Sequence, residues 1–291
     1  MIIDTAASTA KGTSMIAHEG LLDVRQVSVR YPLAGRTGYT AVDRISLTLD
    51  PGETLGIVGE SGCGKSSLAR ALLRLIEPQE GEIWICGENI LQADRKAVNR
   101  IRRHIQMVFQ DPSASLDPRQ TIASAIMEPM RIYRLHASET QYEQHCIKLL
   151  EQVGLSPRLR FRFPHEFSGG QLQRVGIARA LALSPKILVA DEPVSSLDVS
   201  IQAQVINLFK ELQEELGLAL IFISHDLSIV RFLAHRIAVM NQGRIVELGR
   251  AEQVCGAPTH PYTKALIRSI PHADLGQRMN HAPLKRMDTH L

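Results

Sequence analysis

A glycine-rich segment between a short apolar run and a helix-prone stretch constrains the fold more than any other feature. Residues 59–66 read Gly-Glu-Ser-Gly-Cys-Gly-Lys-Ser, which fits the spacing G-x-x-x-x-G-K-[ST]. The apolar run Thr54–Val58 precedes this segment, and the helix-prone stretch Ser67–Leu75 follows it. A strand, a glycine-rich turn and a helix in this order surround phosphates with backbone N–H groups. The sequence therefore predicts a site for a nucleoside triphosphate.

The side chains of this segment suit the same ligand. Lys65 is expected to reach the β- and γ-phosphates, and the Ser66 hydroxyl can ligate Mg²⁺. A chance glycine-rich turn is the alternative, and the strand before and helix after count against it. The residues predicted to contact the nucleotide here are Gly59, Glu60, Ser61, Gly62, Cys63, Gly64, Lys65, Ser66 and Ser67.

The overall charge of the chain does not indicate a charged macromolecular partner. Its 291 residues are enough for one large or two modest domains. Lysine and arginine total 33 against 30 aspartates and glutamates, and a net charge of +3 is too mild to indicate nucleic acid or an acidic membrane surface. The basic stretch at residues 95–103 is interpreted as a solvated face.

The cysteines and the apolar runs indicate a reducing compartment and no membrane-spanning segment. Four separated cysteines without a C-x-x-C pair suit a reducing compartment and argue against a disulfide framework or a zinc site. No apolar run approaches the roughly 18 residues that would span a bilayer. Residues 1–20 lack the features of a secretory signal and are interpreted as a flexible leader. Any membrane role is expected to come through a partner.

Apolar strand patterns alternate with helical patterns along the chain. Continuous apolar strands between helices indicate a mainly parallel sheet covered on both faces. Strands are expected at residues 22–29, 45–49, 54–58, 81–85, 104–109, 187–190, 219–224, 236–240 and 244–248, and helices at 67–75, 170–183 and 200–216, with a helical region between 119 and 164. The expected domains are a leader (1–20), a nucleotide-binding domain (21–250, with a helical insertion at about 115–180), and an appendix with a tail (251–291).

Two acidic residues follow a predicted buried strand. A phosphate loop alone does not distinguish between kinases, GTPases, helicases and transporters. Asp191 and Glu192 come directly after the apolar strand Ile187–Ala190. At the end of a strand beside the phosphate loop, Asp191 can hold Mg²⁺ and Glu192 can polarise an attacking water. A surface Asp-Glu-Pro turn is the alternative interpretation.

A second candidate anion site precedes this strand by about twenty residues. Ser168, Gly169, Gly170 and Gln171 open a predicted helix, and a serine with two glycines at a helix start can bind an anion. One nucleotide cannot comfortably use two phosphate cradles of one compact domain. We therefore predict a head-to-tail dimer in which this segment serves the nucleotide of the partner.

With these motifs in this order, the chain resembles the nucleotide-binding subunit of an ATP-binding cassette (ABC) transporter over about residues 21–249. The resemblance implies the P-loop NTPase fold of that family, an α/β cassette with a mainly parallel core sheet, an antiparallel β subdomain and an inserted helical subdomain. It also implies ATP and Mg²⁺ as ligands and ATP hydrolysis as the activity.

The resemblance assigns roles to residues outside the phosphate loop. Tyr31 matches the aromatic residue that stacks on adenine, Gln110 the lid glutamine, and His225 the γ-phosphate switch. The implied catalytic residues are Glu192, His225, Lys65 and Gln110; the implied magnesium ligands are Ser66, Gln110 and Asp191; the implied dimer loop is Ser196, Leu197 and Asp198. Departures from the family pattern at Phe167, Val194 and Ser196 remove no catalytic group, so we expect a hydrolysis-competent site.

Two further stretches resemble the dipeptide, oligopeptide and nickel importers. They are residues 107–119, which include Gln110, and Thr259–Leu266 in the appendix. Many relatives carry a cysteine-rich tail that holds an iron–sulfur cluster. Only Cys255 lies nearby in this chain, so no cluster is expected.

The importer resemblance implies a peripheral subunit at the cytoplasmic face of the inner (plasma) membrane. Its expected partners are a second ABC ATPase subunit or a second copy of itself, two transmembrane permease subunits and a solute-binding protein, with no nucleic acid. Dipeptides, oligopeptides, nickel chelates and other small solutes stay open as cargo. An exporter ATPase, a phosphate-loop kinase and a non-transport ABC protein acting on DNA or ribosomes are the alternatives.

Overall fold

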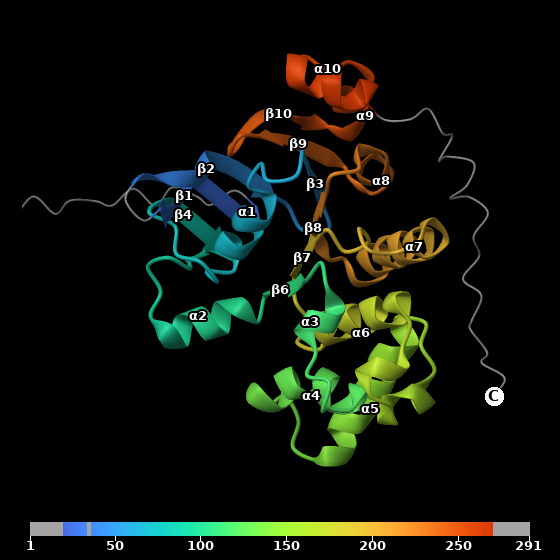
Figure 1. Ribbon diagram of the computed structural model, residues 1–291. Coiled ribbons are helices and arrows are strands. Elements are labelled where there is room, and N and C mark those ends of the chain that lie inside the picture. Colours follow the sequence, from blue (N-terminus) through green and yellow to red (C-terminus); the bar gives the residue numbers. More distant parts are fainter. Residues whose placement is uncertain (1–19, 34–35, 270–291) are drawn as a thin grey trace, which may run out of the picture.

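The computed structural model describes residues 20–33 and 36–269, which form two sheets with helices around them (Figure 1). The expected tail beyond residue 269, and all but the last residue of the expected leader, lie outside the described residues. The antiparallel sheet has the strand order β2-β1-β4-β5. Its strands are β1 (Leu22–Leu33), β2 (Arg36–Leu49), β4 (Glu80–Ile85) and β5 (Glu88–Asn89).

The second sheet has the strand order β10-β9-β3-β8-β7-β6. Its strands are β3 (Thr54–Val58), β6 (Ile105–Val108), β7 (Ile187–Asp191), β8 (Ala219–Ser224), β9 (Arg236–Asn241) and β10 (Arg244–Arg250). Strands β9, β3, β8, β7 and β6 pair in parallel, whereas β10 pairs with β9 in antiparallel. Every residue of β3, β7 and β8 is buried, as expected for parallel strands covered on both faces.

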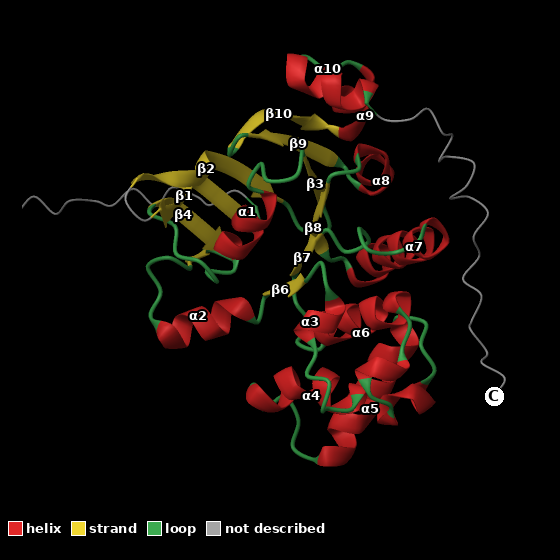
Figure 2. Cartoon of the chain, in the orientation of Figure 1, coloured by secondary structure: helices red, strands yellow, loops and turns green. Residues whose placement is uncertain are grey.

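The helices fall into three groups around the sheets (Figure 2). Four lie along the sheets: α1 (Lys65–Leu72), α2 (Arg95–Arg102), α7 (Val199–Leu216) and α8 (Leu227–Leu233). A separate helical group contains α3 (Pro112–Ser115), α4 (Ile122–Ile132), α5 (Glu139–Gln152), α6 (Gly169–Leu181) and the 3₁₀ turns Pro157–Phe161 and Pro164–Glu166. Helices α9 (Ala251–Gly256) and α10 (Pro261–Arg268) lie beside β10.

The two faces of the parallel sheet belong to separate hydrophobic cores. Leu55 and Ile57 of β3 pack in one core with α1 and the antiparallel sheet. Leu220 and Phe222 of β8 pack in the other core with α7 and the helical group. The two layers thereby fix the carboxyl ends of the central strands, from which the candidate site is built. This architecture confirms the predicted α/β fold class.

The basic stretch at residues 95–103 is largely a solvated face, as interpreted from the sequence, because Arg95, Lys96, Arg100 and Arg103 are exposed. It forms the amphipathic helix α2, with Val98 and Ile101 buried. The Arg102 guanidinium donates hydrogen bonds to the carbonyl oxygens of Leu73 and Arg74, at 2.9 and 2.7 Å. The helix is therefore docked on the end of the α1 segment.

Within residues 20–33 and 36–269, no helix combines the length and the apolar content that crossing a bilayer requires.

Candidate nucleotide-binding and catalytic site

The phosphate loop lies between β3 and α1, and two of its glycines are required by close packing. Gly64 has φ +106°, and a Cβ there would lie 1.9 Å from the carbonyl oxygen of Ala41. A Cβ on Gly59 would lie 2.1 Å from the carbonyl oxygen of Met240. Any larger residue would push the loop off the strands that hold it, so the loop conformation depends on these two glycines.

The start of α1 provides donors for an anionic ligand. The first hydrogen bond of the helix runs from the Leu68 N–H to the Gly64 carbonyl, at 2.9 Å. The N–H groups of the first turn have no carbonyl partner within their helix, and the helix dipole places partial positive charge there. A loop closed against the sheet and leading into such a helix end fits the phosphates of a nucleotide.

The Lys65 amine lies inside this loop. Its side chain is only 4% exposed, and Nζ donates to the carbonyl oxygens of Gly59 and Glu60 at 2.8 and 2.9 Å. The same Nζ lies 3.8 Å from Oε1 of Glu192. The structure therefore places the cation between the phosphate loop and the predicted catalytic carboxylate.

Ser66 and Asp191 meet beside the loop. The Ser66 hydroxyl donates to Oδ1 of Asp191 at 3.0 Å. Burial raises the pKa of Asp191 above its ordinary value, and the hydrogen bond from Ser66 opposes that rise. A hydroxyl and a buried carboxylate are oxygen ligands of the kind that Mg²⁺ prefers, so the pair fits the predicted metal.

Glu192 stands between Lys65 and His225. It follows the last residue of β7 with φ +45°, a left-handed conformation that costs a residue with a side chain roughly 1–3 kcal/mol. Its Oε2 lies 3.2 Å from Nδ1 of His225, which follows the end of β8, and its side chain is 15% exposed. Lys65, Glu192 and His225 thus form a continuous row along the carboxyl ends of β3, β7 and β8.

Gln110 reaches this row through a residue that the sequence analysis missed. The Gln110 amide donates to the Ser195 hydroxyl at 3.4 Å, and that hydroxyl donates to the Glu192 carbonyl at 3.1 Å. Ser195 was not among the predicted site residues. Its place directly after Asp191-Glu192-Pro193-Val194 was the available signal.

Two tyrosines contact the phosphate loop and α1 from the antiparallel sheet. Tyr31 and Tyr39 face each other in the β1–β2 register. The Tyr31 hydroxyl lies 3.1 Å from the Ser67 hydroxyl, and the Tyr39 hydroxyl donates to the Gly62 carbonyl at 3.0 Å. Tyr31 was predicted at the nucleotide, whereas Tyr39 was missed because no local pattern separates it from an ordinary strand residue.

Ser168–Gln171 begins α6 as a capping box. The Ser168 hydroxyl accepts from the Gln171 N–H at 3.4 Å, and the Gln171 side chain accepts from the Ser168 N–H at 3.0 Å. A Cβ on Gly170 would lie 2.3 Å from Cγ2 of Ile201, so Gly170 also permits close packing of α6 on α7. Ser168 and Gly169 are exposed. Among the described residues, no recorded hydrogen bond or ion pair joins this segment to residues 59–67 of the same chain.

The predicted dimer loop lies at the start of α7. Ser196 and Asp198 are exposed, and Leu197 is half-buried. Asp198 caps α7 by accepting the Ile201 N–H at 3.1 Å. The next residue, Val199, is 63% exposed, which is unusual for an apolar side chain. This short segment therefore presents an apolar residue to the outside next to the capped helix end.

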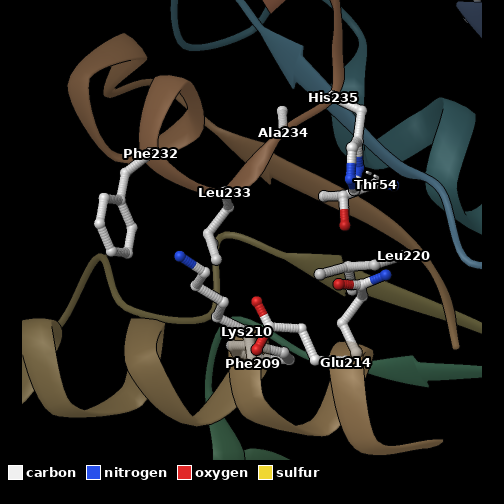
Figure 3. Close-up of a pocket in the computed structure, with 10 residues that line it drawn as sticks. Thr54, Phe209, Lys210, Glu214, Leu220, Phe232, Leu233, Ala234 and His235 are labelled. Carbon is white, nitrogen blue, oxygen red and sulfur yellow. Dashed lines mark hydrogen bonds between the residues drawn. The ribbon is translucent and has the colours of Figure 1, made fainter. Parts of the chain in front are cut away.

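A cavity of about 220 Å³ between α7 and α8 is a different feature (Figure 3). Thr54, the first residue of β3, and Leu220, near the start of β8, are among its lining residues, with Lys210, Phe232 and His235. The cavity thus lies at the amino ends of the strands, opposite the edge that carries the phosphate loop. It contains none of the predicted site residues.

Comparison with protein families matches two parts of the chain. Residues 42–195 match the ABC transporter family, and residues 246–289 match the oligopeptide/dipeptide transporter C-terminal region. The first match contains the phosphate loop and the Asp191–Glu192 pair. The second begins in β10 and continues through α9 and α10.

Two relatives illustrate the sequence similarity. The oligopeptide transport ATP-binding protein OppF of Haemophilus influenzae is 52% identical over 234 residues, which cover 80% of this chain and 70% of OppF. The glutathione import ATP-binding protein GsiA of Pectobacterium atrosepticum is 49% identical over 274 residues, 91% of this chain. The chain spans only 44% of the length of that GsiA protein.

Two solved structures illustrate the similarity of the fold. A dimeric ATP-binding cassette, MJ0796, in a post-hydrolysis state bound to ADP and Pi, superposes with a TM-score of 0.72 at 31% identity. That match covers 79% of this chain and 98% of the solved one. The cassette cbiO1 from Clostridium perfringens, part of the complex cbiONQ, gives a TM-score of 0.72 at 28% identity, covering 82% and 92%. The chain therefore belongs to the ABC transporter ATP-binding family, in the branch that carries the oligopeptide/dipeptide transporter C-terminal region.

Proposed function

We propose that this chain binds ATP with Mg²⁺ and hydrolyses it to drive solute import through a membrane permease. The observation that carries the proposal is the row of Lys65, Glu192 and His225 beside the phosphate loop, with distances of 3.8 and 3.2 Å between neighbours. An amine, a carboxylate and an imidazole in this order supply a phosphate-binding cation, a water-polarising base and a second phosphate contact.

Each group has a defined task in hydrolysis. Lys65 would exchange its two carbonyl partners in the loop for the β- and γ-phosphates. Glu192 would orient the attacking water and accept its proton, while His225 would contact the γ-phosphate and hold the carboxylate. Ser66 and Asp191 would hold Mg²⁺, which neutralises developing charge on the phosphates when it is bound.

We propose that the working unit contains two cassettes arranged head to tail. Ser168 and Gly169 are exposed, and the segment 168–171 makes no recorded bond to the phosphate loop within the described chain. In a head-to-tail pair this segment would complete the nucleotide site of the partner. The relative MJ0796 is described as a dimer, which supports the arrangement.

The cargo is proposed to be a peptide or a related small solute. The relatives are named for oligopeptide transport and glutathione import, and glutathione is itself a small peptide. Nickel chelates stay within the proposed range. The partners would be two permease subunits and a solute-binding protein, with the cassette peripheral on the cytoplasmic face of the membrane. The match to the oligopeptide/dipeptide C-terminal region favours an importer over an exporter or a DNA- or ribosome-remodelling ATPase.

A single substitution tests the assignment of the base. Glu192→Gln keeps the shape of the side chain but cannot accept a proton, so ATP should still bind while turnover falls about 10²–10⁴-fold. Phosphate release and binding of a fluorescent ATP analogue measure the two effects. Glu143→Gln, an exposed change on α5, is the matched control and should behave as wild type. Turnover within a few-fold of wild type in Glu192→Gln would reject this residue as the base.

A further inference from the structure

One carboxylate of β10, that of Glu247, holds the turn of the appendix that leads into α10. Glu247 accepts hydrogen bonds from the Thr259 N–H at 2.8 Å, the Thr259 hydroxyl at 3.0 Å and the His260 N–H at 3.0 Å. Burial alone would raise the pKa of Glu247, but the hydrogen bonds from Thr259 and His260 lower it to about 2. The carboxylate is therefore ionised at neutral pH and holds the turn before α10.

The same turn sets the direction of Tyr262. Nδ1 of His260 accepts the Tyr262 N–H at 3.2 Å and caps α10, and Pro261 occupies the first helical position. Thr263, the next residue, is fully buried. Because the residues on both sides of Tyr262 are held in place, its side chain extends from the start of α10 in a defined direction.

That direction leads to the phosphate loop. The Tyr262 hydroxyl accepts the Glu60 N–H at 3.0 Å, across 202 residues of sequence. The carbonyl of the same residue, Glu60, accepts from the Lys65 amine at 2.9 Å. The tyrosine of the appendix therefore holds the Gly59–Glu60 peptide, whose own carbonyl also accepts from the Lys65 amine, at 2.8 Å.

Other backbone groups of the loop are held in the same way. The Gly62 carbonyl accepts from Tyr39 at 3.0 Å, and the Cys63 carbonyl accepts from the Gly243 N–H at 2.9 Å. These contacts come from the antiparallel sheet and from the β9–β10 hairpin. They leave the N–H groups at the start of α1 for phosphates, and the appendix supplies the contact at the entrance of the loop.

We propose that Tyr262 is a positioning residue for nucleotide binding, and that Glu247 acts through it by fixing the start of α10. The C-terminal appendix is then part of the nucleotide site: its hydroxyl holds the phosphate loop in the shape that receives a triphosphate. The inference rests on the proposed ATP binding. It adds one requirement from outside the phosphate-loop motif, the hydrogen bond between Tyr262 and the Glu60 N–H.

Removing one hydroxyl tests the first part. In the full 291-residue chain, Tyr262→Phe should raise the Kd for ATP about 2- to 10-fold, the range expected for one neutral hydrogen bond. The kcat at saturating ATP should stay unchanged, because the bound triphosphate would then hold the loop and the Lys65 amine in place of these contacts. Hydrogen exchange of the peptide containing residues 59–64 should become faster without nucleotide. Tyr133→Phe removes a comparable bond to the Asn99 carbonyl, 2.8 Å long and away from the loop, and should change neither quantity.

A double-mutant cycle tests the second part. Glu247→Gln should raise the Kd for ATP in the wild-type background but add little in the Tyr262→Phe background, because the carboxylate acts through the tyrosine. Effects that add fully would overturn the role of Glu247. An unchanged Kd in Tyr262→Phe, with wild type binding ATP, would overturn the inference and leave the proposed function standing. Failure of the wild-type chain to bind ATP would overturn both.

Discussion

Asp191 is a residue of this site whose buried carboxylate lowers the stability of the folded protein. It is 4% exposed at the end of a fully buried strand, and burial raises its pKa. The Ser66 hydroxyl donates a hydrogen bond to this carboxylate, and the charges of Arg70 and Lys65 also favour its ionised form, but burial outweighs them. Such a residue costs folding free energy, and the cost is explained if a bound cation later compensates it.

This placement predicts opposite effects on stability and turnover. Asp191→Asn should raise the melting temperature at pH 7, because the folded protein no longer buries an ionised carboxylate, and should lower Mg²⁺-dependent ATP turnover by about 100-fold or more. The folded pKa lies above the unfolded one, so the ionised group costs stability at pH values above the folded pKa. The difference in melting temperature should therefore shrink as the pH falls toward 3.8.

Thermal melts across pH and a phosphate-release assay measure both effects. For the thermal melts, Asp198→Asn is the matched control, since Asp198 is exposed and its pKa is lowered by the Ser200 hydroxyl. That variant should lose a little stability at pH 7 rather than gain it. A destabilised Asp191→Asn protein would contradict the prediction.

Sequence predicts the residues of this site that belong to local motifs. Lys65, Asp191 and Glu192 follow from spacing and from their places after apolar strands. Ser195 and Tyr39 were missed because their contacts to Gln110 and Gly62 join positions 85 and 23 residues apart. Only Ser195 had a local signal, its place shortly after Asp191-Glu192. The structure brings Lys65, Glu192 and His225 together, with Ser66 and Asp191 beside them, whereas Ser168–Gln171 lies apart at the start of α6. The roles of these residues in hydrolysis remain predictions.

At the scale of elements, two helices begin with the same device. Ser138 and Gln141 form a capping box at the start of α5, as Ser168 and Gln171 do at the start of α6. A capping box satisfies two N–H groups of a helix start, so each serine stabilises its own helix. The proposed dimer gives the second serine an additional contact that the first lacks.

This pair allows local stability to be separated from function. Ser138→Ala and Ser168→Ala should each cost about 1 kcal/mol of stability, the usual value for losing an N-cap side chain. Only Ser168→Ala should also reduce ATP turnover and ATP-dependent association, by about tenfold if it removes one contact to a phosphate. Urea unfolding and phosphate release measure the two effects. Equal turnover in both variants would leave Ser168 as a helix cap alone.

The predicted elements match the structure where the periodicity is long. The strand expected at residues 219–224 is β8, and the helix expected at 200–216 is α7 with one more residue at its start. Helices α2 and α8 were not predicted, because each is short and has its apolar residues fixed by tertiary packing. Val98 and Ile101 of α2, only two apolar positions among charged neighbours, give too weak a pattern.

On the scale of the whole molecule, the phosphate loop and the Ser168–Gln171 segment belong to different bodies. The loop lies among the two sheets, whereas α6 lies in the helical group (Figure 1). The exposed Val199 lies at the start of α7, which packs against α6. An apolar side chain in this position is suited to be covered by a second copy of the cassette.

This arrangement predicts association that depends on ATP. The Glu192→Gln variant should form dimers with ATP and stay monomeric without it, because slow hydrolysis leaves the triphosphate between the two chains. Adding Val199→Asp should weaken dimerisation about tenfold or more, since a charge would be buried in the contact. Light scattering across protein concentration measures the constant. Ile132→Asp, at a residue 69% exposed on α4, is the matched control; an equal loss there would argue against a specific contact at Val199.

The contact between Tyr262 and Glu60 has a practical consequence for fragments of this polypeptide. A version cut after Arg250 retains both sheets and the complete glycine-rich motif, and by sequence criteria it would pass as an intact ATPase. It would nevertheless lack the Tyr262 phenol, which accepts the Glu60 N–H at the start of the glycine-rich loop. The affinity for ATP measured on such a fragment would then be lower than that of the uncut protein. Shortened cassettes of this branch should therefore retain the segment through α10.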